Sequence, residues 1–341
     1  MASKTDPKAT RVKNLALAVG SLLITLLLAE GAVRIFVPVR SVGPAFSVND
    51  SVYGHALKRS FSATRIAPEF TMRFTTNSLG FRGPEPEAFP HRPLLFLGDS
   101  FTEGYGVNDG EEFPALVRKA LENRNPERKI PVVNAGIGYN GNGRWVKFLR
   151  NEGTRYNPRL VVLQLTKNDF KDNVRERLFT LTHSGELLEL PVPPPGITRR
   201  LAVLIEAVLG LSSSHLVGLV KQVVWATRPY VPPPKPKPGA SAEEEVGPHD
   251  QLTFRLLKEI LTICGRERWP VLSVIVGIRG QRLAQLERLF RGFYVEMIVV
   301  PDKPTRPDLY YKVDGHWNAS GHAFVAESIL NWLLARGLSA E

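Results

Sequence analysis

Residues 98–104 of the sequence read GDSFTEG, and the apolar run PLLFL at residues 93–97 leads directly into them. A short apolar run that ends at turn residues predicts a buried strand followed by a sharp turn. Open α/β sheets bind ligands at the carboxyl ends of their strands, so Ser100 is expected where its hydroxyl can meet a ligand. Its backbone N–H, at the start of a helix, can face an oxyanion. Ser100 is therefore a candidate nucleophile.

Short apolar runs alternate with amphipathic stretches along the rest of the chain. The predicted strands are residues 93–97, 130–134, 159–165, 271–277 and 294–300. The predicted helices are residues 111–124, 143–152, 250–267, 280–291 and 319–336. This alternation predicts an α/β fold in which a parallel sheet carries helices on both faces.

A second polar cluster, DGHWN at residues 314–318, comes just before the last predicted helix. A serine hydroxyl is a weak nucleophile until a base removes its proton, and that base is usually an imidazole held by a carboxylate. We therefore predict Ser100 as nucleophile, His316 as general base and then acid, and Asp314 as the group that fixes the imidazole. His322, within the last predicted helix, is expected to cap that helix or to pack in the core.

An esterase-type site also needs hydrogen-bond donors for an oxyanion. The backbone N–H of Ser100 is one candidate. The glycine-rich turn NAGIGYNG at residues 134–141 offers Gly138, or alternatively Gly136, as a second. The side-chain amide of Asn168, after the third strand, is a plausible third donor.

Simpler interpretations of these residues stay open. An Asp-Ser turn before a helix is a common N-cap, so Asp99 could be structural support and nothing more. Asp169 is expected to brace its loop rather than react. His316, His322 and Asp314 could be mistaken for metal ligands, but the grouped set of three or four ligands that a metal needs is missing. We expect no metal and no cofactor.

Composition sets broad limits. The chain has 341 residues, 43% of them hydrophobic, a formal net charge of +11 and a single cysteine, Cys264. This length can bury one substantial core and an appendage. The positive charge suits an anionic surface, yet no groove-reading motif is present, so nucleic-acid binding is not expected.

The amino-terminal stretch predicts a membrane anchor. Residues 1–13 carry basic side chains, and an uncharged apolar run extends from Leu15 to Ala29. Residues 14–37 are long enough to cross a bilayer as a signal anchor, although Ala29-Glu30-Gly31 offers a weak cleavage site and a buried helix is an alternative. Basic residues before the span predict a cytoplasmic amino terminus. We expect a single-pass protein of a bacterial inner membrane, with its catalytic domain facing the periplasm.

The remaining organisation follows from proline clusters and turn signals. Residues 38–92 form a Pro/Gly-containing approach segment, and residues 93–174 and 249–341 form the two parts of the α/β domain. Residues 175–248 form a proline-flanked insertion with an apolar stretch from Leu201 to Val220. The insertion is predicted to cap the site, to lie against the bilayer surface, or to pack on its own domain.

Together these blocks resemble the SGNH/GDSL hydrolase superfamily. The resemblance covers residues 75–172 and 270–335. Its four blocks match Ser100, Gly138 (or Gly136), Asn168, and Asp314 with His316. The upstream segment NSLGFRG, residues 77–83, is similar to one found in many membrane-anchored bacterial members. The resemblance implies a flavodoxin-like three-layer α/β/α fold, and ester hydrolysis or acyl transfer without a cofactor.

Two departures from the family pattern are visible. Lys167 stands where many members have glycine before Asn168, which could alter the preference for substrate charge. Asp314 precedes His316 by two residues instead of the more common three.

Three functions are compatible with these residues. The leading one is a serine esterase that hydrolyses acyl or acetyl esters of envelope glycans, lipids or small molecules through an acyl-enzyme on Ser100. The first alternative is an O-acyltransferase that uses the same triad on a polysaccharide. The second is a non-catalytic binding or assembly module with this fold. The sequence leaves the substrate and the oligomeric state open.

Overall fold

The computed structural model describes residues 7–37, 39, 41–86, 92–127, 129–196, 200, 204, 211–226 and 248–338. The first six residues of the predicted basic tail, and the second proline cluster with the linker after it, lie outside the described residues. The chain divides into two compact units. The larger comprises Ala45–Thr64, Glu69–Pro195 and Tyr230–Glu341, and the smaller comprises Met1–Pro44, Arg65–Pro68 and Gly196–Pro229.

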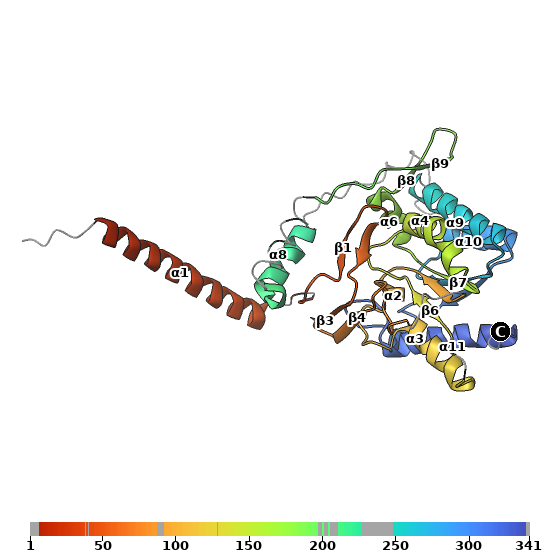
Figure 1. Ribbon diagram of the computed structural model, residues 1–341, viewed down its shortest axis with the longest axis horizontal. Helices are drawn as coiled ribbons and strands as arrows, with labels where there is room; N and C mark the ends of the chain where they lie inside the picture. The colour runs from red at the N-terminus through yellow and green to blue at the C-terminus, as the bar shows by residue number, and fades with distance from the viewer. Residues whose placement is uncertain are drawn as a thin grey trace, which may run out of the picture. The chain divides into compact units, whose positions relative to one another are not determined.

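A five-stranded parallel sheet forms the centre of the larger unit (Figure 1). Its strands are β5 (Leu94–Leu97), β6 (Val132–Asn134), β7 (Leu160–Thr166), β10 (Val271–Val276) and β11 (Glu296–Val300). They lie in the order β11-β10-β7-β5-β6, which is the flavodoxin-like order. The predicted α/β fold with a parallel sheet is therefore confirmed, and all five strands lie within the predicted ranges or one residue beyond them.

Both faces of the sheet are buried, as near-continuous apolar strands require. In β5, Leu94 and Phe96 contribute to one hydrophobic cluster, whereas Leu95 and Leu97 contribute to another. This alternation follows from the two-residue period of a strand. Both clusters continue into helices, so the sheet is the middle of three layers.

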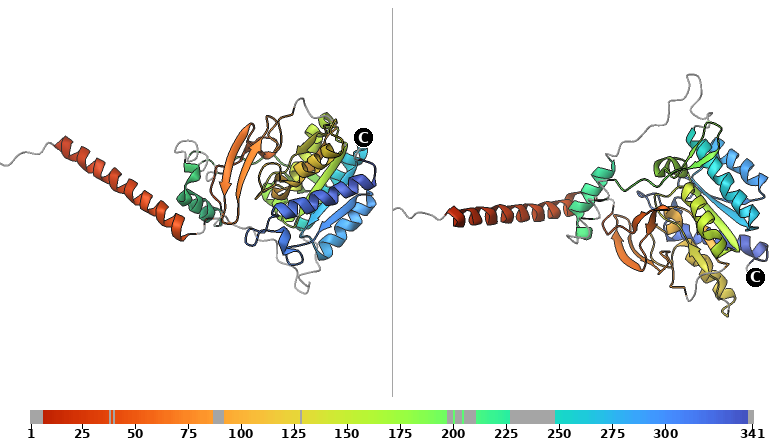
Figure 2. Two further views of the ribbon diagram at one scale, coloured as in Figure 1. Left: turned by 90° about the horizontal axis from the view of Figure 1, so that it is seen from below. Right: turned by 45° about the horizontal axis from the view of Figure 1, so that its top comes forward.

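Helices cover both faces of the sheet (Figure 2). The main helices are α3 (Phe113–Arg124), α4 (Asn142–Phe148), α6 (Asp169–Glu176), α9 (Pro248–Arg266), α10 (Gly280–Gly292) and α11 (Ala319–Ala335). Helices α3 and α11 pack on the face of Leu94 and Phe96, and α4, α6, α9 and α10 pack on the opposite face. Shorter turns complete the set: α2 (Ser100–Glu103), the π-helix η1 (Leu149–Gly153), α5 (Thr154–Tyr156) and the 3₁₀ turn η3 (Pro307–Leu309).

Small sheets surround this core. The approach segment forms two two-stranded sheets, and the start of the predicted insertion forms a third. Their strands are β1 (Ser47–Asp50), β2 (Gly54–Leu57), β3 (Phe61–Ile66), β4 (Thr71–Thr76), β8 (Phe179–Leu181) and β9 (Leu187–Glu189). Phe46 and Phe74 stack with ring centroids 4.3 Å apart. The part of the approach segment in the larger unit thus has a packed aromatic core of its own.

The smaller unit contains α1 (Pro7–Phe36), the 3₁₀ turn η2 (Leu211–Ser213) and α8 (His215–Ala226). Within the described residues, α1 holds one stretch, Thr10–Phe36, that is long and apolar enough to cross a membrane. The carboxylate of Glu30 on α1 accepts hydrogen bonds from the backbone N–H groups of His215 (2.9 Å) and Leu216 (2.8 Å) at the start of α8. The residues predicted as one insertion therefore divide between the two units.

Candidate active site

Ser100 is the first residue of α2, directly after β5. The turn between them requires glycine at position 98, because a Cβ there would lie 2.6 Å from the Cβ of Thr102 and 2.7 Å from Oε1 of Gln164. This tight turn places Ser100 at the carboxyl end of β5, next to the central strand β7. The first N–H groups of a helix have no partner within the helix, so the Ser100 N–H is oriented to donate outward.

Ser100, His316 and Asp314 form a continuous hydrogen-bonded chain. The Oγ atom of Ser100 lies 2.7 Å from Nε2 of His316, and Nδ1 of His316 contacts Oδ1 of Asp314. The same Oδ1 accepts the backbone N–H of His316 at 3.3 Å. Gly315 has a φ of 87°, a left-handed conformation that glycine adopts without strain, and it lets its two neighbours face each other. The three predicted catalytic residues are thus brought together.

Aromatic rings fix the imidazole of His316. Its centroid lies 4.9 Å from the ring of Phe101 and 4.9 Å from that of Tyr105. The loop that carries His316 is closed by a β-bridge between Tyr310 and Trp317, and Trp317 is fully buried. The His316 side chain nevertheless stays 24% exposed, so it is held in place and still reachable by substrate.

Asp99 joins the ends of β5 and β7 beneath Ser100. One carboxylate oxygen accepts the N–H of Phe101 at 3.0 Å and caps α2. The other accepts the Thr166 hydroxyl at 2.8 Å and the Asn168 amide at 3.0 Å. The side chain is almost wholly buried. Asp99 therefore caps α2 and links it to the loop after β7.

The two candidate oxyanion glycines have different surroundings. A Cβ on Gly138 would lie 3.5 Å from the Cβ of Ser100, which places Gly138 beside the nucleophile. A Cβ on Gly136 would lie 2.6 Å from Thr102, so Gly136 packs against α2. The Gly138 N–H, however, donates to the carboxylate of Glu103, and the Gly136 N–H donates to Asn134 at 3.1 Å. In this structure neither N–H is directed to an oxyanion at Ser100.

Asn168 has a similar arrangement. Its amide nitrogen donates to Asp99 and to Asp172, both at 3.0 Å. The two amide hydrogens thus face two carboxylates rather than the space above Ser100. The sequence could not reveal this competition, because Asp172 follows Asn168 by one helical turn inside α6 and looks like any helix residue.

Asp169 is fully buried and braces the loop, as the sequence predicts. Its Oδ2 atom accepts the backbone N–H of Thr166 at 2.9 Å. Burial raises the pKa of Asp169 well above its ordinary value, and the neighbouring carboxylate of Asp99 raises it further. The hydrogen bond from Thr166 opposes both effects.

His322 packs in the core, as expected. It is completely buried, and its Nδ1 atom accepts the Phe113 N–H at 3.3 Å. Burial lowers the pKa of His322 to about 3, so this imidazole is neutral. Among the described residues, no cluster of three or more His, Cys, Asp or Glu side chains could hold a metal ion.

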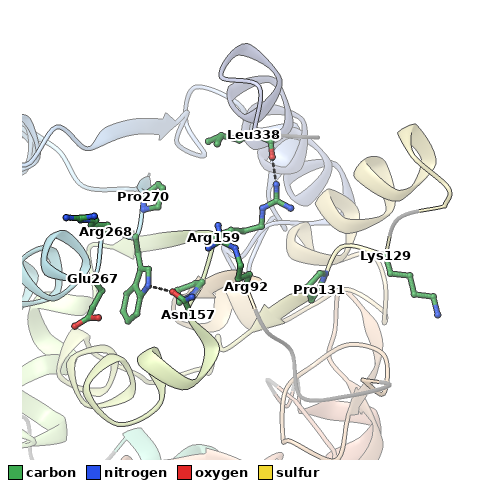
Figure 3. A pocket seen from close by; sticks show the side chains of 11 residues that line it. Arg92, Lys129, Pro131, Asn157, Arg159, Glu267, Arg268, Pro270 and Leu338 are labelled. Atoms are coloured by element: carbon green, nitrogen blue, oxygen red, sulfur yellow. Dashed lines mark hydrogen bonds between the residues drawn. The ribbon is translucent and has the colours of Figure 1, made fainter. Parts of the chain in front are cut away.

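A cavity of about 440 Å³ lies elsewhere (Figure 3). It is lined by Pro131, Arg159 and Pro270, each of which directly precedes a strand of the central sheet. Trp269 donates to Asn157 at 3.0 Å in its wall. The cavity thus lies at the amino ends of the strands, opposite the edge that carries Ser100 and where open α/β sheets bind ligands.

Two residues of the site were missed from the sequence. Thr166 ends β7 and donates to Asp99, and Glu103 occupies the Gly138 N–H. Glu103 stands three residues after Ser100, one helical turn away, which places both side chains on neighbouring positions of α2. That spacing places Glu103 near Ser100, but neither it nor the place of Thr166 at a strand end indicates the hydrogen bonds that these residues make.

The chain is similar to one family of known proteins and to several solved structures. The model of the GDSL-like lipase/acylhydrolase family matches residues 96–324. Three similar solved structures are a lipolytic protein of the G-D-S-L family from Desulfitobacterium hafniense (11% identity, 71% of this chain and 99% of that one, TM-score 0.39), a psychrotrophic esterase from Pseudoalteromonas sp. (14%, 71% and 98%, 0.40) and a catalytic mutant of an acetylxylan esterase from Geobacillus stearothermophilus (13%, 72% and 95%, 0.39). No curated protein matches the chain. The family match spans well over half of the sequence and includes both blocks of the hydrogen-bonded chain, so this protein belongs to the GDSL-like lipase/acylhydrolase family.

Proposed function

We propose that this hydrolase is a membrane-anchored serine esterase that cleaves acyl or acetyl esters of envelope glycans or lipids. The observation that carries the proposal is the 2.7 Å contact between Ser100 Oγ and His316 Nε2, with Asp314 on the other ring nitrogen. A carbonyl-directed nucleophile needs this arrangement of hydroxyl, imidazole and carboxylate.

The reaction proceeds in two halves. Ser100 Oγ attacks the ester carbonyl carbon while its proton moves to Nε2 of His316, and the oxyanion is stabilised by the N–H at the start of α2. His316 then gives this proton to the departing alcohol oxygen as the C–O bond breaks, which leaves the acyl group on Ser100. A water molecule attacks the acyl-enzyme, passes a proton to His316, and releases the acid as Ser100 recovers its proton.

The side chains around Ser100 are partly exposed, which favours a substrate whose ester group is accessible from solvent. His316 and Asp314 are 24% and 26% exposed, and Tyr139, next to Gly138, is 63% exposed. An exposed aromatic side chain has an apolar face and a polar tip, which suits a substrate that combines both characters. These features support a substrate presented on a surface, such as a glycan or a lipid headgroup.

The decisive experiment uses p-nitrophenyl acetate and the variant Ser100→Ala. Loss of the nucleophile should lower kcat/KM on the order of 10³-fold or more. Ser184→Ala is the matched control, because this hydroxyl lies in the turn between β8 and β9 and bonds only locally to Thr182 among the contacts described for it. A fluorophosphonate probe should label wild type at Ser100. Equal turnover by wild type and Ser100→Ala would refute the esterase assignment.

The contacts of Glu30 support the proposal that the amino-terminal helix is retained as a membrane anchor. Its carboxylate accepts hydrogen bonds from the Ser214 hydroxyl (2.7 Å) and from two N–H groups of α8, and α1 continues as a helix to Phe36. Cleavage at residues 29–31 would cut through this helix and remove the cap of α8. We therefore favour a retained span, and the basic residues that precede it favour an α/β domain on the periplasmic side. Mass spectrometry of the membrane-extracted protein should find the intact amino-terminal helix; a mature chain that begins near residue 30 would exclude it.

A further inference from the structure

The approach segment, residues 38–92, makes hydrogen bonds to the backbone of the loops that carry the candidate catalytic residues. Its strands β1 to β4 precede the first catalytic block in the sequence. Side chains at three positions, 55, 69 and 82, make hydrogen bonds to main-chain atoms next to the catalytic residues. All three belong to the same compact unit as Ser100 and His316.

Glu69 holds the loop that carries Asp314, the acid loop. Its Oε1 accepts the N–H of Lys312 at 2.7 Å, and its Oε2 accepts those of Val313 and Asp314 at 2.8 and 2.7 Å. Burial alone would raise the pKa of Glu69, but the three backbone N–H groups outweigh it and lower the pKa. Glu69 is therefore a carboxylate at neutral pH. Three consecutive N–H groups that meet one carboxylate fix the direction in which the Asp314 side chain leaves the backbone.

The next residue, Phe70, links the same turn to the imidazole. Its ring contacts Tyr105 edge-on at 5.3 Å and Tyr311 at 4.9 Å. Tyr105 lies against His316, and the Tyr311 hydroxyl donates to the carbonyl of Gly106 at 2.7 Å. The β3–β4 turn thus contacts the backbone of Asp314 through hydrogen bonds, and it is linked to His316 through the ring of Tyr105.

His55 on β2 holds the second loop. Its Nε2 lies 3.1 Å from the carbonyl oxygen of Gly138. A carbonyl only accepts, so Nε2 carries the hydrogen. The peptide bond is planar, and this contact therefore fixes the orientation of the 138–139 peptide beside Ser100. Arg144 in turn donates to the carbonyl of His55 at 3.2 Å.

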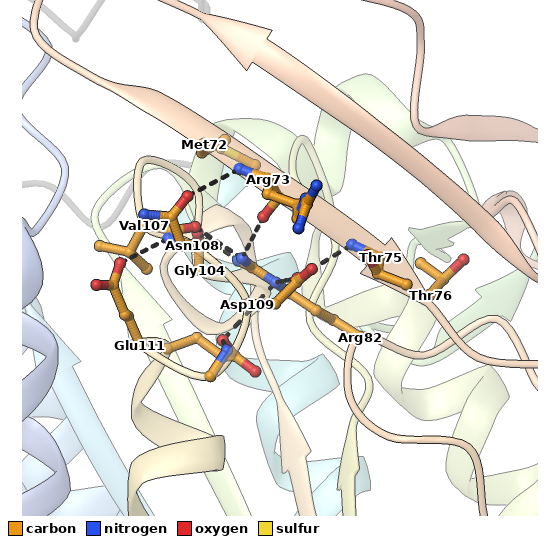
Figure 4. Close-up of polar contacts among 12 residues, drawn as sticks. Met72, Arg73, Thr75, Thr76, Arg82, Gly104, Val107, Asn108, Asp109 and Glu111 are labelled. Carbon is orange, nitrogen blue, oxygen red and sulfur yellow. Dashed lines mark hydrogen bonds and ion pairs between the residues drawn. The ribbon is translucent and has the colours of Figure 1, made fainter.

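Arg82 holds the end of the nucleophile helix (Figure 4). Its side chain is fully buried, and one guanidinium nitrogen donates to the carbonyls of Glu103 (3.0 Å) and Gly104 (2.6 Å). Another donates to the carbonyl of Val107 at 2.7 Å, and Nε pairs with Asp109 at 3.1 Å. The carbonyls at the end of a helix lack intrahelical donors, and Arg82 supplies them.

We propose that the approach segment is a positioning element of the active site, in which Glu69, His55 and Arg82 hold the acid loop, the glycine loop and the nucleophile helix. This inference rests on the proposed function, since it assigns the three side chains to the same hydrolytic site. None of them is a catalytic residue: each acts through the backbone it holds. Hydrogen bonds between side chain and backbone are well suited to this task, because they fix a loop that has no strand or helix partner.

The sharpest test changes Glu69 to Gln, with Glu85→Gln as matched control. Glu85 belongs to the same segment and accepts one N–H, that of Ser78 at 2.9 Å, away from the site. A glutamine at 69 places an NH₂ group against backbone N–H groups, so the acid loop shifts. We expect kcat on p-nitrophenyl acetate to fall about 10- to 100-fold with KM unchanged. Glu85→Gln should retain wild-type values.

A double-mutant cycle separates positioning from general stability. If Glu69 acts through Asp314, then Glu69→Gln should cause no further loss of kcat in an Asp314→Ala background. Multiplicative losses, or a loss of kcat that only follows a fall in the folded fraction, would overturn the proposal. Ser100-dependent turnover by wild type is measured in parallel. If that turnover is absent, the proposed function fails; if it is present and Glu69→Gln behaves as wild type, only the positioning role fails.

His55 provides a second variant pair. Glutamine at position 55 keeps an N–H donor for the Gly138 carbonyl, whereas leucine removes it. We expect His55→Gln to retain most of kcat and His55→Leu to lose about 10-fold or more, with thermal unfolding of both followed as control. Equal activity of the two variants would overturn the role of this hydrogen bond.

Discussion

Replacing Asp314 by asparagine separates two effects of the catalytic acid, its charge and its orientation of the base. Both His316 contacts, from Nδ1 and from the backbone N–H, go to the same oxygen, Oδ1. An asparagine can place its carbonyl oxygen there and keep both hydrogen bonds, so Asp314→Asn should lose the charge and retain the imidazole orientation. Asp314→Ala loses both.

The size of the expected loss of kcat in Asp314→Asn follows from the partial exposure of His316 and Asp314. His316 and Asp314 are 24% and 26% exposed, so an effective dielectric constant between about 20 and 80 applies, and two charges about 4 Å apart interact by about 1–4 kcal/mol. Loss of that interaction with the imidazolium lowers kcat about 5- to 1000-fold. Loss of the imidazole orientation as well should lower the kcat of the alanine variant further.

Steady-state hydrolysis of p-nitrophenyl acetate by wild type, Asp314→Asn and Asp314→Ala measures this order directly. KM should stay constant across the series, because Asp314 acts on the transition state through His316. Burst kinetics report the acylation half-reaction separately. An alanine variant as active as the asparagine variant, or an asparagine variant as inactive as Ser100→Ala, would contradict this account of Asp314.

Two further predictions concern buried positions near the site. Burial raises the pKa of Glu176 from 4.5 to about 8, so the folded state holds this proton more tightly than the unfolded state. The stability that the proton contributes below pH 4.5 is therefore lost as the pH rises to about 8, and Glu176→Gln should remove a slope of up to about 1.4 kcal/mol per pH unit from the urea-derived free energy of unfolding. Parallel pH profiles for wild type and Glu176→Gln would exclude the effect. Gly136→Ala should lower the free energy of unfolding by about 1–3 kcal/mol in the same assay, because a Cβ there meets the backbone of Thr102. Gly138→Ala should lower it less, because the nearest carbon to a Cβ there lies at 3.5 Å. The reverse order would contradict this packing.

The sequence pointed to Ser100, His316 and Asp314 as candidates because each is marked by its place relative to an apolar strand or the last helix, and the structure places the three in one hydrogen-bonded chain. A strand followed by Gly98-Asp99-Ser100 fixes where the serine must lie, and the parallel topology brings the ends of all strands to one edge. The two-residue spacing of Asp314 and His316 required only a turn, which Gly315 makes. These are local signals, and the predicted three-layer architecture followed from the same kind of pattern.

The oxyanion donors and the positioning contacts could not be found in this way. Whether the Gly138 N–H faces substrate or the Glu103 carboxylate depends on a side chain about 35 residues away in the chain. Glu69 and Asp314 are separated by 245 residues, and neither belongs to a periodic pattern that would announce the contact. Contacts of this kind arise from tertiary packing, which propensity and spacing do not encode.

Several carboxylates gather at the carboxyl edge of the sheet, yet only one is suited to the triad. Asp99 is nearly fully buried and occupied by the Thr166 hydroxyl, the Asn168 amide and a helix N–H. Asp169 is fully buried with a raised pKa, so it is a poor anion to stabilise an imidazolium. Asp314 remains partly exposed on a glycine-containing turn and faces the ring of His316. Its role therefore follows from the surroundings of each acid, and the carboxylate of Glu69, by holding the turn, is what keeps those surroundings in place.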